Sequence, residues 1–257
     1  MPEYCKTERD GHLLIITLNR PEVMNAMHSH AHFELDAIFN EFEADPEQWV
    51  AIVTGAGDKA FCAGNDLKWQ ASGGVMERPD TGFIGLCNRY NVQKPIIAAV
   101  NGLAMGGGFE VALACDIIIA AENAFFALPE PRVGLAAMAG GLIRLPRQIP
   151  QKQAMGMILT GRRVMAEEGY RLGFVTEVVP EGQALAGARR WAEQILECSP
   201  LSIRASKDVV MRSRDIPTVE AAFKEPYESI KTMRASEDFI EGPKAFSEKR
   251  KPNWKGR

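Results

Sequence analysis

Three adjacent glycines are the first feature of the sequence whose type and spacing suggest chemistry. Gly106, Gly107 and Gly108 follow an apolar run and precede residues that favour a helix. Glycine lets the backbone approach a ligand closely, and the first N–H groups of a helix have no partner within it. Such a junction can hold a phosphate or a developing oxyanion, although a tight turn between strand and helix needs the same residues. Adjacent glycines lack the GxGxxG spacing that the phosphate alternative requires.

A second junction of this kind lies earlier in the chain, in the sequence AFCAGNDL at residues 60–67. Small residues lead into Asn65 and Asp66, which are favoured at the N-cap of a helix. Backbone N–H groups would again point outward. Two such junctions can converge on one carbonyl oxygen, because an oxyanion hole needs two donors. Taken alone, this segment is better explained by ordinary helix capping.

Two glutamates follow the glycines and suggest acid–base chemistry. Glu110 lies among apolar residues in the first turn of the expected helix, and Glu130 lies between Pro129 and Pro131, which stiffen its loop. A carboxylate at a buried helix start either caps the helix or acts as an acid or base. If the two carboxyl groups meet in one pocket, they perturb each other and one can stay protonated near neutral pH.

The histidines at alternate positions 28, 30 and 32 are the other cluster of potential ligands. On a helix only His28 and His32 would share a face, and no acidic or cysteine ligand is placed to complete a tetrahedral site. We therefore expect an exposed helix there and no bound metal. The patterns of a serine hydrolase elbow, a zinc protease and a phosphate-binding loop are all missing from the sequence.

The elements that must position these residues alternate in type. Apolar, β-rich runs predict strands, and apolar residues at helical spacing predict helices. Strands are expected at residues 12–18, 49–54, 95–100, 116–120 and 124–128, and helices at 27–43 and 109–114. Residues 70–85 are expected to form a mobile loop, which is often a functional lid. Helices are expected at 151–159, 166–172, 183–197, 202–212 and through 219–257. This order predicts a layered α/β fold with a helical C-terminal part.

Composition narrows the class of protein. The chain has 257 residues, 46% of them hydrophobic and 25% charged, with a net charge of −3, as in ordinary globular proteins. The acidic balance argues against binding to nucleic-acid phosphates. No apolar stretch approaches the twenty or so residues of a membrane span, and the N-terminus lacks a secretory pattern. Five cysteines without a CxxC pair indicate free thiols in a reducing compartment. We expect a cytoplasmic enzyme with no membrane partner.

These features, in this order, resemble the crotonase superfamily, also called the enoyl-CoA hydratase/isomerase family. The resemblance runs from residue 13 to the C-terminus. It rests on LNRP at residues 18–21, TGAG at 54–57, FCAGNDL at 61–67, KPIIAAVNG at 94–102, GGGFE at 106–110, CD at 115–116 and FALPE at 126–130. Each stretch is weakly specific by itself, and together they are highly specific.

The resemblance implies the fold, the assembly and the substrate. It implies a crotonase-like spiral of ββα units, with a catalytic core at residues 1–200 and a C-terminal helical region at 201–257 that builds homotrimers, often paired as hexamers. It also implies an acyl-CoA substrate. Coenzyme A then enters as part of the thioester, and no other cofactor and no metal is expected.

The resemblance also assigns roles at the site. The main-chain N–H groups of Asn65 and Gly107 would hold the thioester oxygen. Glu110 would activate a water molecule and Glu130 would protonate C2, which favours reversible hydration by a hydro-lyase. Asn65 replaces the small residue usual at its position and would narrow or polarise the acyl pocket. The other residues expected to contact substrate are Met24, Ala26, Ala63, Gly64, Asp66, Leu67, Gly106, Pro129 and Lys249.

Finer features point to branches of the family. The sequences of residues 160–163, 236–246 and 248–257 resemble the carnitinyl-CoA dehydratase branch, whose acyl chain carries a trimethylammonium group. Trp69 is a candidate partner for such a cation. Ala137 and Met138 stand where common hydratases have a proline, which affects the acyl preference. A double-bond isomerase using one glutamate and a non-catalytic RNA-binding relative are the alternatives, and the net charge does not support the second.

Overall fold

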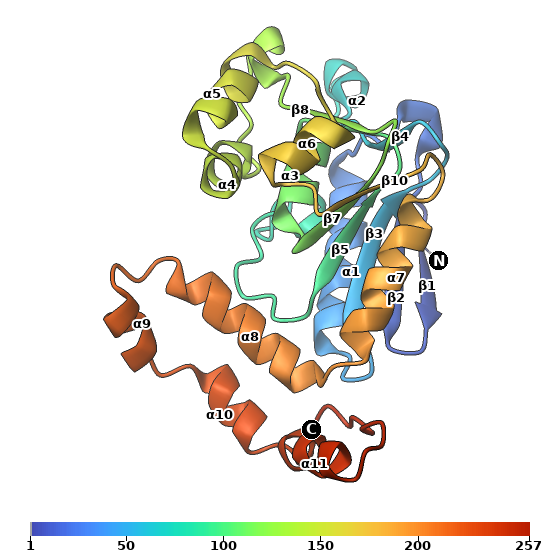
Figure 1. Ribbon diagram of the computed structural model, residues 1–257. Helices are drawn as coiled ribbons and strands as arrows, with labels where there is room; N and C mark the ends of the chain where they lie inside the picture. Colours follow the sequence, from blue (N-terminus) through green and yellow to red (C-terminus); the bar gives the residue numbers. More distant parts are fainter. Residues whose placement is uncertain (1) are drawn as a thin grey trace.

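Two β-sheets form the centre of the protein in the computed structural model, which describes residues 2–257 (Figure 1). The larger sheet has the strand order β1-β2-β3-β5-β7-β10, and the smaller has the order β4-β6-β8-β9. The larger sheet contains β1 (Cys5–Asp10), β2 (Leu13–Leu18), β3 (Val50–Gly55), β5 (Ile96–Val100), β7 (Ile117–Ala121) and β10 (Glu177–Val179). The smaller contains β4 (Ala60–Cys62), β6 (Leu103–Met105), β8 (Phe125–Ala127) and β9 (Val164–Met165).

Helices follow the strands in the first half of the chain and make up most of the second half. The α-helices are α1 (Ser29–Ala44), α2 (Leu67–Ala71), α3 (Gly107–Ala114), α4 (Gly141–Gln148), α5 (Gln151–Thr160), α6 (Ala166–Leu172), α7 (Ala184–Leu196), α8 (Pro200–Ser213), α9 (Val219–Lys224), α10 (Glu228–Arg234) and α11 (Glu237–Ser247). Short 3₁₀ turns are η1 (Pro21–Val23), η2 (Phe83–Gly85) and η3 (Glu130–Val133). The fold is α/β, as the sequence predicts.

A ββα unit repeats along the chain and explains why distant segments meet. In β3-β4-α2 and again in β5-β6-α3, the first strand joins the larger sheet and the second joins the smaller. The pair β7-β8 repeats the same arrangement and leads into η3. Because β4, β6 and β8 are neighbours in one sheet, the segments that leave their carboxyl ends also lie side by side. These segments carry the two glycine-rich junctions and Glu130.

Apolar strands and small helical residues build the core. The side chains of β3 and β5 are buried on both faces, which fits their nearly continuous apolar sequences. The helix α7 packs on β3 and β5, opposite α1 (Figure 1). Its buried face consists of Ala184, Gly187, Ala188 and Ala192. A Cβ on Gly187 would stand 2.9 Å from Cγ2 of Ile119, so only small residues allow this close approach.

The C-terminal arm, residues 200–257, extends away from the two sheets (Figure 1). Its first helix, α8, is tied to the core because Nζ of Lys207 lies 2.7 Å from Oδ2 of Asp116. Helix is expected through residues 219–257, and this is wrong at the end, since α11 stops at Ser247 and residues 248–257 form no regular structure. Pro252 lacks an N–H, and the tail instead folds back so that Nε1 of Trp254 donates to the carbonyl of Glu197 (2.8 Å). The division at residues 200/201 coincides with the start of α8 and stays a prediction.

One strand of the larger sheet was not expected from the sequence. The strand β1 pairs antiparallel with β2 along the edge of the larger sheet. Five of its six side chains are exposed, so it lacks the apolar pattern that reveals a buried strand. No helix within residues 2–257 is long and apolar enough to span a membrane.

Candidate active site

The start of α3 leaves a backbone amide free at the centre of the molecule. Gly106 has φ 53°, and Gly107 begins the helix. A Cβ on Gly107 would lie 2.6 Å from Cζ of Phe83, and one on Gly108 would collide with the carbonyl of Cys62. The glycines therefore permit close packing as well as positive φ. The N–H of Gly107 has no hydrogen-bond acceptor among residues 2–257.

The second junction lies directly beside the first. Met27 N–H donates to the carbonyl of Gly64 (2.8 Å), and Asp66 N–H donates to the carbonyl of Met27 (2.9 Å). This bridge leaves the N–H of Asn65 without an acceptor in the described chain. Gly64 has φ +90°, and a Cβ there would stand 3.0 Å from the nitrogen of Gly107. The two junctions are therefore in contact, as their sequences suggest.

The two glutamates face the same region from different elements. Glu110, in the first turn of α3, is only 3% exposed, and its Oε1 accepts a hydrogen bond from Gly141 N–H (2.8 Å). Burial raises the pKa of Glu110 to about 7, and the nearby Glu130 carboxyl group adds to the rise. Two acids that perturb each other at a glycine-rich helix start are suited to move protons.

Glu130 lies over the glycine junction. It begins η3, and its Oε1 would be 3.0 Å from a Cβ placed on Gly106. Its Oε2 is buried and has no hydrogen-bond partner among the residues described. Burial raises the pKa of Glu130. A buried acceptor without a partner is costly, so this oxygen is placed to bond a ligand or water.

The chain matches a known family along almost its full length. A family model described as "Enoyl-CoA hydratase/isomerase" matches residues 8–257. The chain belongs to the enoyl-CoA hydratase/isomerase family. It is 45% identical, over 270 aligned residues covering all of both chains, to a protein of Escherichia coli (strain K12) named carnitinyl-CoA dehydratase. The predicted crotonase membership, fold class and hydro-lyase type of enzyme are thereby confirmed.

Solved structures of the family agree with this fold. The structure of an enoyl-CoA hydratase from Mycobacterium tuberculosis H37Rv has a TM-score of 0.93 and 38% identity, with 99% of each chain covered. The structure of a carnitinyl-CoA hydratase from Mycobacterium avium has a TM-score of 0.79 and 40% identity, with 100% of each chain covered. Both named activities occur among relatives of similar identity, so similarity alone does not choose between them.

Other residues expected at the site hold the second junction in place. Asp66 is the buried N-cap of α2: its Oδ1 accepts from Trp69 N–H (3.1 Å) and its Oδ2 pairs with Arg20 (2.9 Å). Ala63 N–H donates to the carbonyl of Met24 (3.0 Å). Three further residues are expected to contact substrate. Ala26 is buried, Leu67 is 45% exposed, and Pro129 is the N-cap of η3.

Lys249 and Trp69 lie in different parts of the molecule, and their expected contacts with substrate stay predictions. Lys249 follows α11, which lies at the opposite end of the molecule from α2 (Figure 1). Its expected contact with coenzyme A stays a prediction that needs a neighbouring subunit. The Trp69 ring packs against His28, with ring centroids 5.0 Å apart, and donates from Nε1 to the carbonyl of Val75 (3.4 Å). Trp69 therefore supports the loop that follows it.

The expectation of an exposed helix with three histidines is wrong. His28 is the buried N-cap of α1, and His32 is fully buried. Nδ1 of His32 accepts from Ile84 N–H (3.1 Å), and burial lowers the pKa of His32 to about 3. The cause is the loop after α2, which covers this end of α1. No cluster of three or more metal-ligating residues exists in the part of the chain that the structure describes.

Sequence reasoning missed Arg78, the residue of the loop that reaches the site. Its Nη2 donates to Oδ1 of Asn65 (3.0 Å), and its guanidinium carbon lies 5.5 Å from the ring centroid of Phe83. That ring packs against Gly107, as described above. A single arginine in an irregular segment gives no periodic or motif signal, so only the fold reveals its position.

Proposed function

We propose that this protein catalyses the reversible addition of water to a trans-2-enoyl-CoA thioester, giving a 3-hydroxyacyl-CoA. The observation that carries the proposal is the placement of two carboxyl groups with raised pKa values, the buried Glu110 and the half-buried Glu130, beside two backbone amides that have no acceptor within residues 2–257. Few arrangements other than an oxyanion hole with an acid–base pair explain both features.

The thioester oxygen is proposed to accept hydrogen bonds from the N–H groups of Asn65 and Gly107. These dipoles are fixed before the reaction, so they stabilise the negative charge of the enolate without reorganisation. The contact between Gly64 and Gly107 supports this, since it keeps the two amides in one region. Coenzyme A is the substrate's carrier, and the proposed chemistry requires no metal and no other cofactor.

The proposed proton transfers divide between the glutamates. Glu110, with Oε1 held by Gly141, takes a proton from water as the oxygen bonds to C3. Its pKa of about 7 leaves a large fraction as carboxylate at neutral pH. Glu130 gives a proton to C2 as the C2–C3 π bond is lost, and burial raises the pKa of Glu130, which favours its protonated form. The proton gained by Glu110 and the one lost by Glu130 re-equilibrate through solvent, so the net addition is one water.

Isotope-labelled water tests the proposal directly. Purified protein with crotonyl-CoA in ¹⁸O-water is expected to form 3-hydroxybutyryl-CoA carrying one ¹⁸O. E110Q and E130Q are each expected to fold and to lose at least about a hundredfold in turnover, since general acid–base groups contribute that much. A double-bond isomerase would act on a 3-enoyl thioester without ¹⁸O uptake. Near-normal turnover in E130Q would remove the two-glutamate mechanism.

Reversible dehydration of a carnitinyl thioester is the second candidate. It is supported by the 45% identity to the Escherichia coli protein named carnitinyl-CoA dehydratase. The same amides and glutamates would act, and only the group at the end of the acyl chain would differ. Parallel assays with crotonyl-CoA and crotonobetainyl-CoA separate the two candidates by kcat/KM.

We also propose that the protein works as a homotrimer or as a pair of trimers, in a reducing compartment such as the cytoplasm. Exposed apolar side chains support an interface: Ile143 in α4 is 59% exposed, Leu159 in α5 is 66% and Phe246 in α11 is 87%. Five free thiols support the compartment. Light scattering after gel filtration measures the assembly, and a monomer at micromolar concentration would contradict it.

A further inference from the structure

Arg78 is a cationic side chain at the proposed site that carries no countercharge. Its single side-chain hydrogen bond within residues 2–257 goes to Asn65, and it forms no ion pair there with a carboxylate. A guanidinium has five N–H donors in a planar fork, so most of them stay available. The residue is exposed, and a ligand can therefore reach it.

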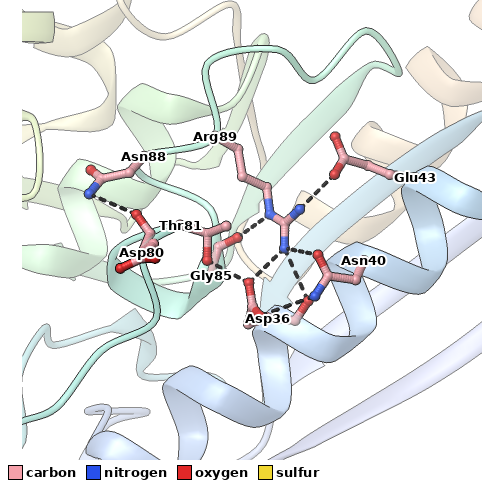
Figure 2. Close-up of polar contacts among 8 residues, drawn as sticks. All are labelled: Asp36, Asn40, Glu43, Asp80, Thr81, Gly85, Asn88 and Arg89. Carbon is pink, nitrogen blue, oxygen red and sulfur yellow. Dashed lines mark hydrogen bonds and ion pairs between the residues drawn. The ribbon is translucent and has the colours of Figure 1, made fainter.

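Contacts on both sides of Arg78 hold this segment against α1. Before it, Glu77 N–H donates to Oγ of Ser29 (2.8 Å), and Oγ of Ser29 donates to the carbonyl of Val75. After it, Oγ1 of Thr81 bonds Oδ1 of Asp36 (2.5 Å; Figure 2). The backbone is therefore tied to one helix on each side, and the side chain spans a short, defined distance to Asn65.

Arg89 clamps the end of the same segment. Its side chain is only 7% exposed and bonds Oδ1 of Asp36 (2.7 Å), Oδ1 of Asn40 (2.7 Å) and Oε2 of Glu43 (2.6 Å) (Figure 2). It also donates to the carbonyl of Gly85. Figure 2 shows these groups converging on one guanidinium between α1 and the loop. The two arginines of this region thus differ: Arg89 forms ion pairs with two acids, whereas Arg78 forms none within residues 2–257.

The position of Arg78 decides which part of a substrate it meets. It bonds the side chain of Asn65, whose own N–H is proposed to hold the thioester oxygen, and it lies over the Phe83 ring that packs on Gly107. It is also near enough to Glu110 to lower the pKa of that group against the effect of burial. In coenzyme A the whole pantetheine arm separates the phosphates from the sulfur. The pantetheine arm itself is uncharged, so among the groups next to the thioester only the acyl chain can carry a charge that complements Arg78.

We propose that Arg78 and Asn65 form a subsite for an acyl chain that carries a carboxylate, and that this subsite disfavours a trimethylammonium group. The inference rests on the proposed function, because the thioester oxygen sets where the acyl chain begins. Guanidinium and carboxylate groups match in charge and in planar geometry. A quaternary ammonium would face the like charge of Arg78, which no carboxylate within residues 2–257 neutralises by a direct ion pair, and specificity of this kind is set by the unfavourable contact as much as by the favourable one.

Binding of saturated thioesters tests the subsite without turnover. Glutaryl-CoA and 4-trimethylammoniobutyryl-CoA have the same chain length and opposite end charge, and 5,5-dimethylhexanoyl-CoA is the neutral match in shape for the cation. The unmodified protein is expected to bind glutaryl-CoA at least about tenfold more tightly than the cationic ester, the range of a charge-assisted hydrogen bond. R78K should keep the sign of this preference, R78Q should reduce it at least about tenfold, and R78E should reverse it.

Arg163 offers a matched control for the loss of one charge. Its guanidinium lies 4.6 Å from the ring centroid of Phe125, it is exposed as Arg78 is, and no hydrogen bond joins it to Asn65 within residues 2–257. R163Q should leave the ratio of affinities at the unmodified value. Equal affinities for the two charged esters, tighter binding of the cation, or the same ratio in R78Q as in the unmodified protein would each overturn the proposal.

Turnover is measured in a separate assay, so that the hydratase activity and the carboxylate subsite can each be refuted without the other. Selective binding of glutaryl-CoA with no hydration of any 2-enoyl thioester would refute the proposed hydratase activity and leave the subsite standing. Hydration of crotonyl-CoA with no charge preference among the saturated esters would refute the subsite and leave the hydratase activity standing. If both stand, kcat/KM for glutaconyl-CoA should exceed that for crotonobetainyl-CoA.

Discussion

At the scale of single residues, the site combines groups that are costly in a folded chain. Glu110 is almost fully buried as a carboxyl group. Within residues 2–257, one buried oxygen of Glu130 has no hydrogen-bond partner, and two backbone N–H groups have no acceptor. Each feature lowers stability unless a ligand compensates it. Their concentration around Gly64 and Gly107 is what distinguishes this region from the rest of the core.

The raised pKa of Glu110 leads to a prediction about stability and pH. The folded-state pKa, about 7, lies above the ordinary value of 4.5, so the folded state prefers the protonated acid. The contribution of Glu110 to the stability of the folded protein is therefore fully present below about pH 4.5, and it is lost as the pH rises through 7. A pKa shift of this size changes the free energy of unfolding by roughly 3 kcal/mol over that pH range. E110Q stays neutral and can still accept from Gly141, so it should be more stable than the unmodified protein at pH 8.

Urea unfolding at pH 5 and pH 8 measures this effect. The free energy of unfolding of E110Q relative to the unmodified protein should rise between the two pH values by about 1–3 kcal/mol. E193Q, on the exposed face of α7, is the control and should show no such rise. A pH-independent difference for E110Q would mean that Glu110 is ionised in the folded protein throughout this range.

Sequence patterns predicted the residues of the site better than their surroundings. Gly106–Gly108, Glu110 and Glu130 could be singled out because glycine, a helix start and a proline-flanked acid have local signatures. The contact of Arg78 with Asn65 joins an irregular loop to a junction thirteen positions earlier, and the partner of Glu110, Gly141 N–H, lies thirty-one positions away. No local pattern encodes such distances, since the fold alone sets them.

At the scale of elements, the loop between α2 and β5 depends on α1 for its position. The sequence predicted a mobile loop at residues 70–85, yet hydrogen bonds from Ser29 and Asp36 of α1 hold it, and Arg89 closes its end (Figure 2). The same loop buries His32 and places Phe83 on Gly107. The strand β1 was not predicted, because its exposed side chains do not form the apolar pattern that indicates a buried strand.

Replacing Arg89 should loosen this loop without unfolding the protein. R89M keeps an unbranched side chain but removes every donor, which leaves Asp36 and Glu43 without their shared partner. Unpaired, partly buried acids destabilise their surroundings. Amide hydrogen exchange at residues 79–89 should therefore be at least about tenfold faster, and kcat/KM should fall because Phe83 and Arg78 lose their support.

A second ion pair to the end of α1 provides the control for R89M. Arg9 pairs with Asp45 (2.8 Å), and its side chain is 56% exposed. Exposed pairs of this kind contribute little, so R9M should leave exchange at residues 79–89 and kcat/KM as they are. If amide hydrogen exchange at residues 79–89 is unchanged in R89M, then Ser29 and Thr81 hold the loop without the contacts of Arg89.

At the scale of the whole molecule, the repeat of ββα units determines where chemistry is possible. Strand order alone brings the carboxyl ends of β4, β6 and β8 together, and each contributes a junction or a glutamate to one place. The sequence predicted the layers and most of the elements because apolar strands and amphipathic helices have distinct periods. The course of residues 248–257 could not be predicted, because it depends on contacts with α7 and α11.

Asp238 joins the end of the chain to the start of α8. It is 3% exposed, its Oδ2 accepts from Oγ of Ser199 (3.0 Å), and its Oδ1 accepts from Lys255 N–H (2.7 Å). D238A removes this acceptor and leaves buried donors unpaired, at a cost of about 2 kcal/mol or more. Local opening of residues 236–257 should then be roughly thirtyfold more frequent, and limited proteolysis should cleave the tail correspondingly faster.

The neighbouring residue separates this effect from a general loss of charge on α11. Glu237 pairs with Arg257 (3.1 Å), and both side chains are exposed, so E237A should be cleaved at the unmodified rate. If the C-terminal arm builds the proposed trimer, D238A should also shift light scattering toward smaller species while far-UV circular dichroism of the core is retained. Equal cleavage of D238A and E237A would mean that the buried carboxylate does not hold the arm, and that the contact of Trp254 with Glu197 does so instead.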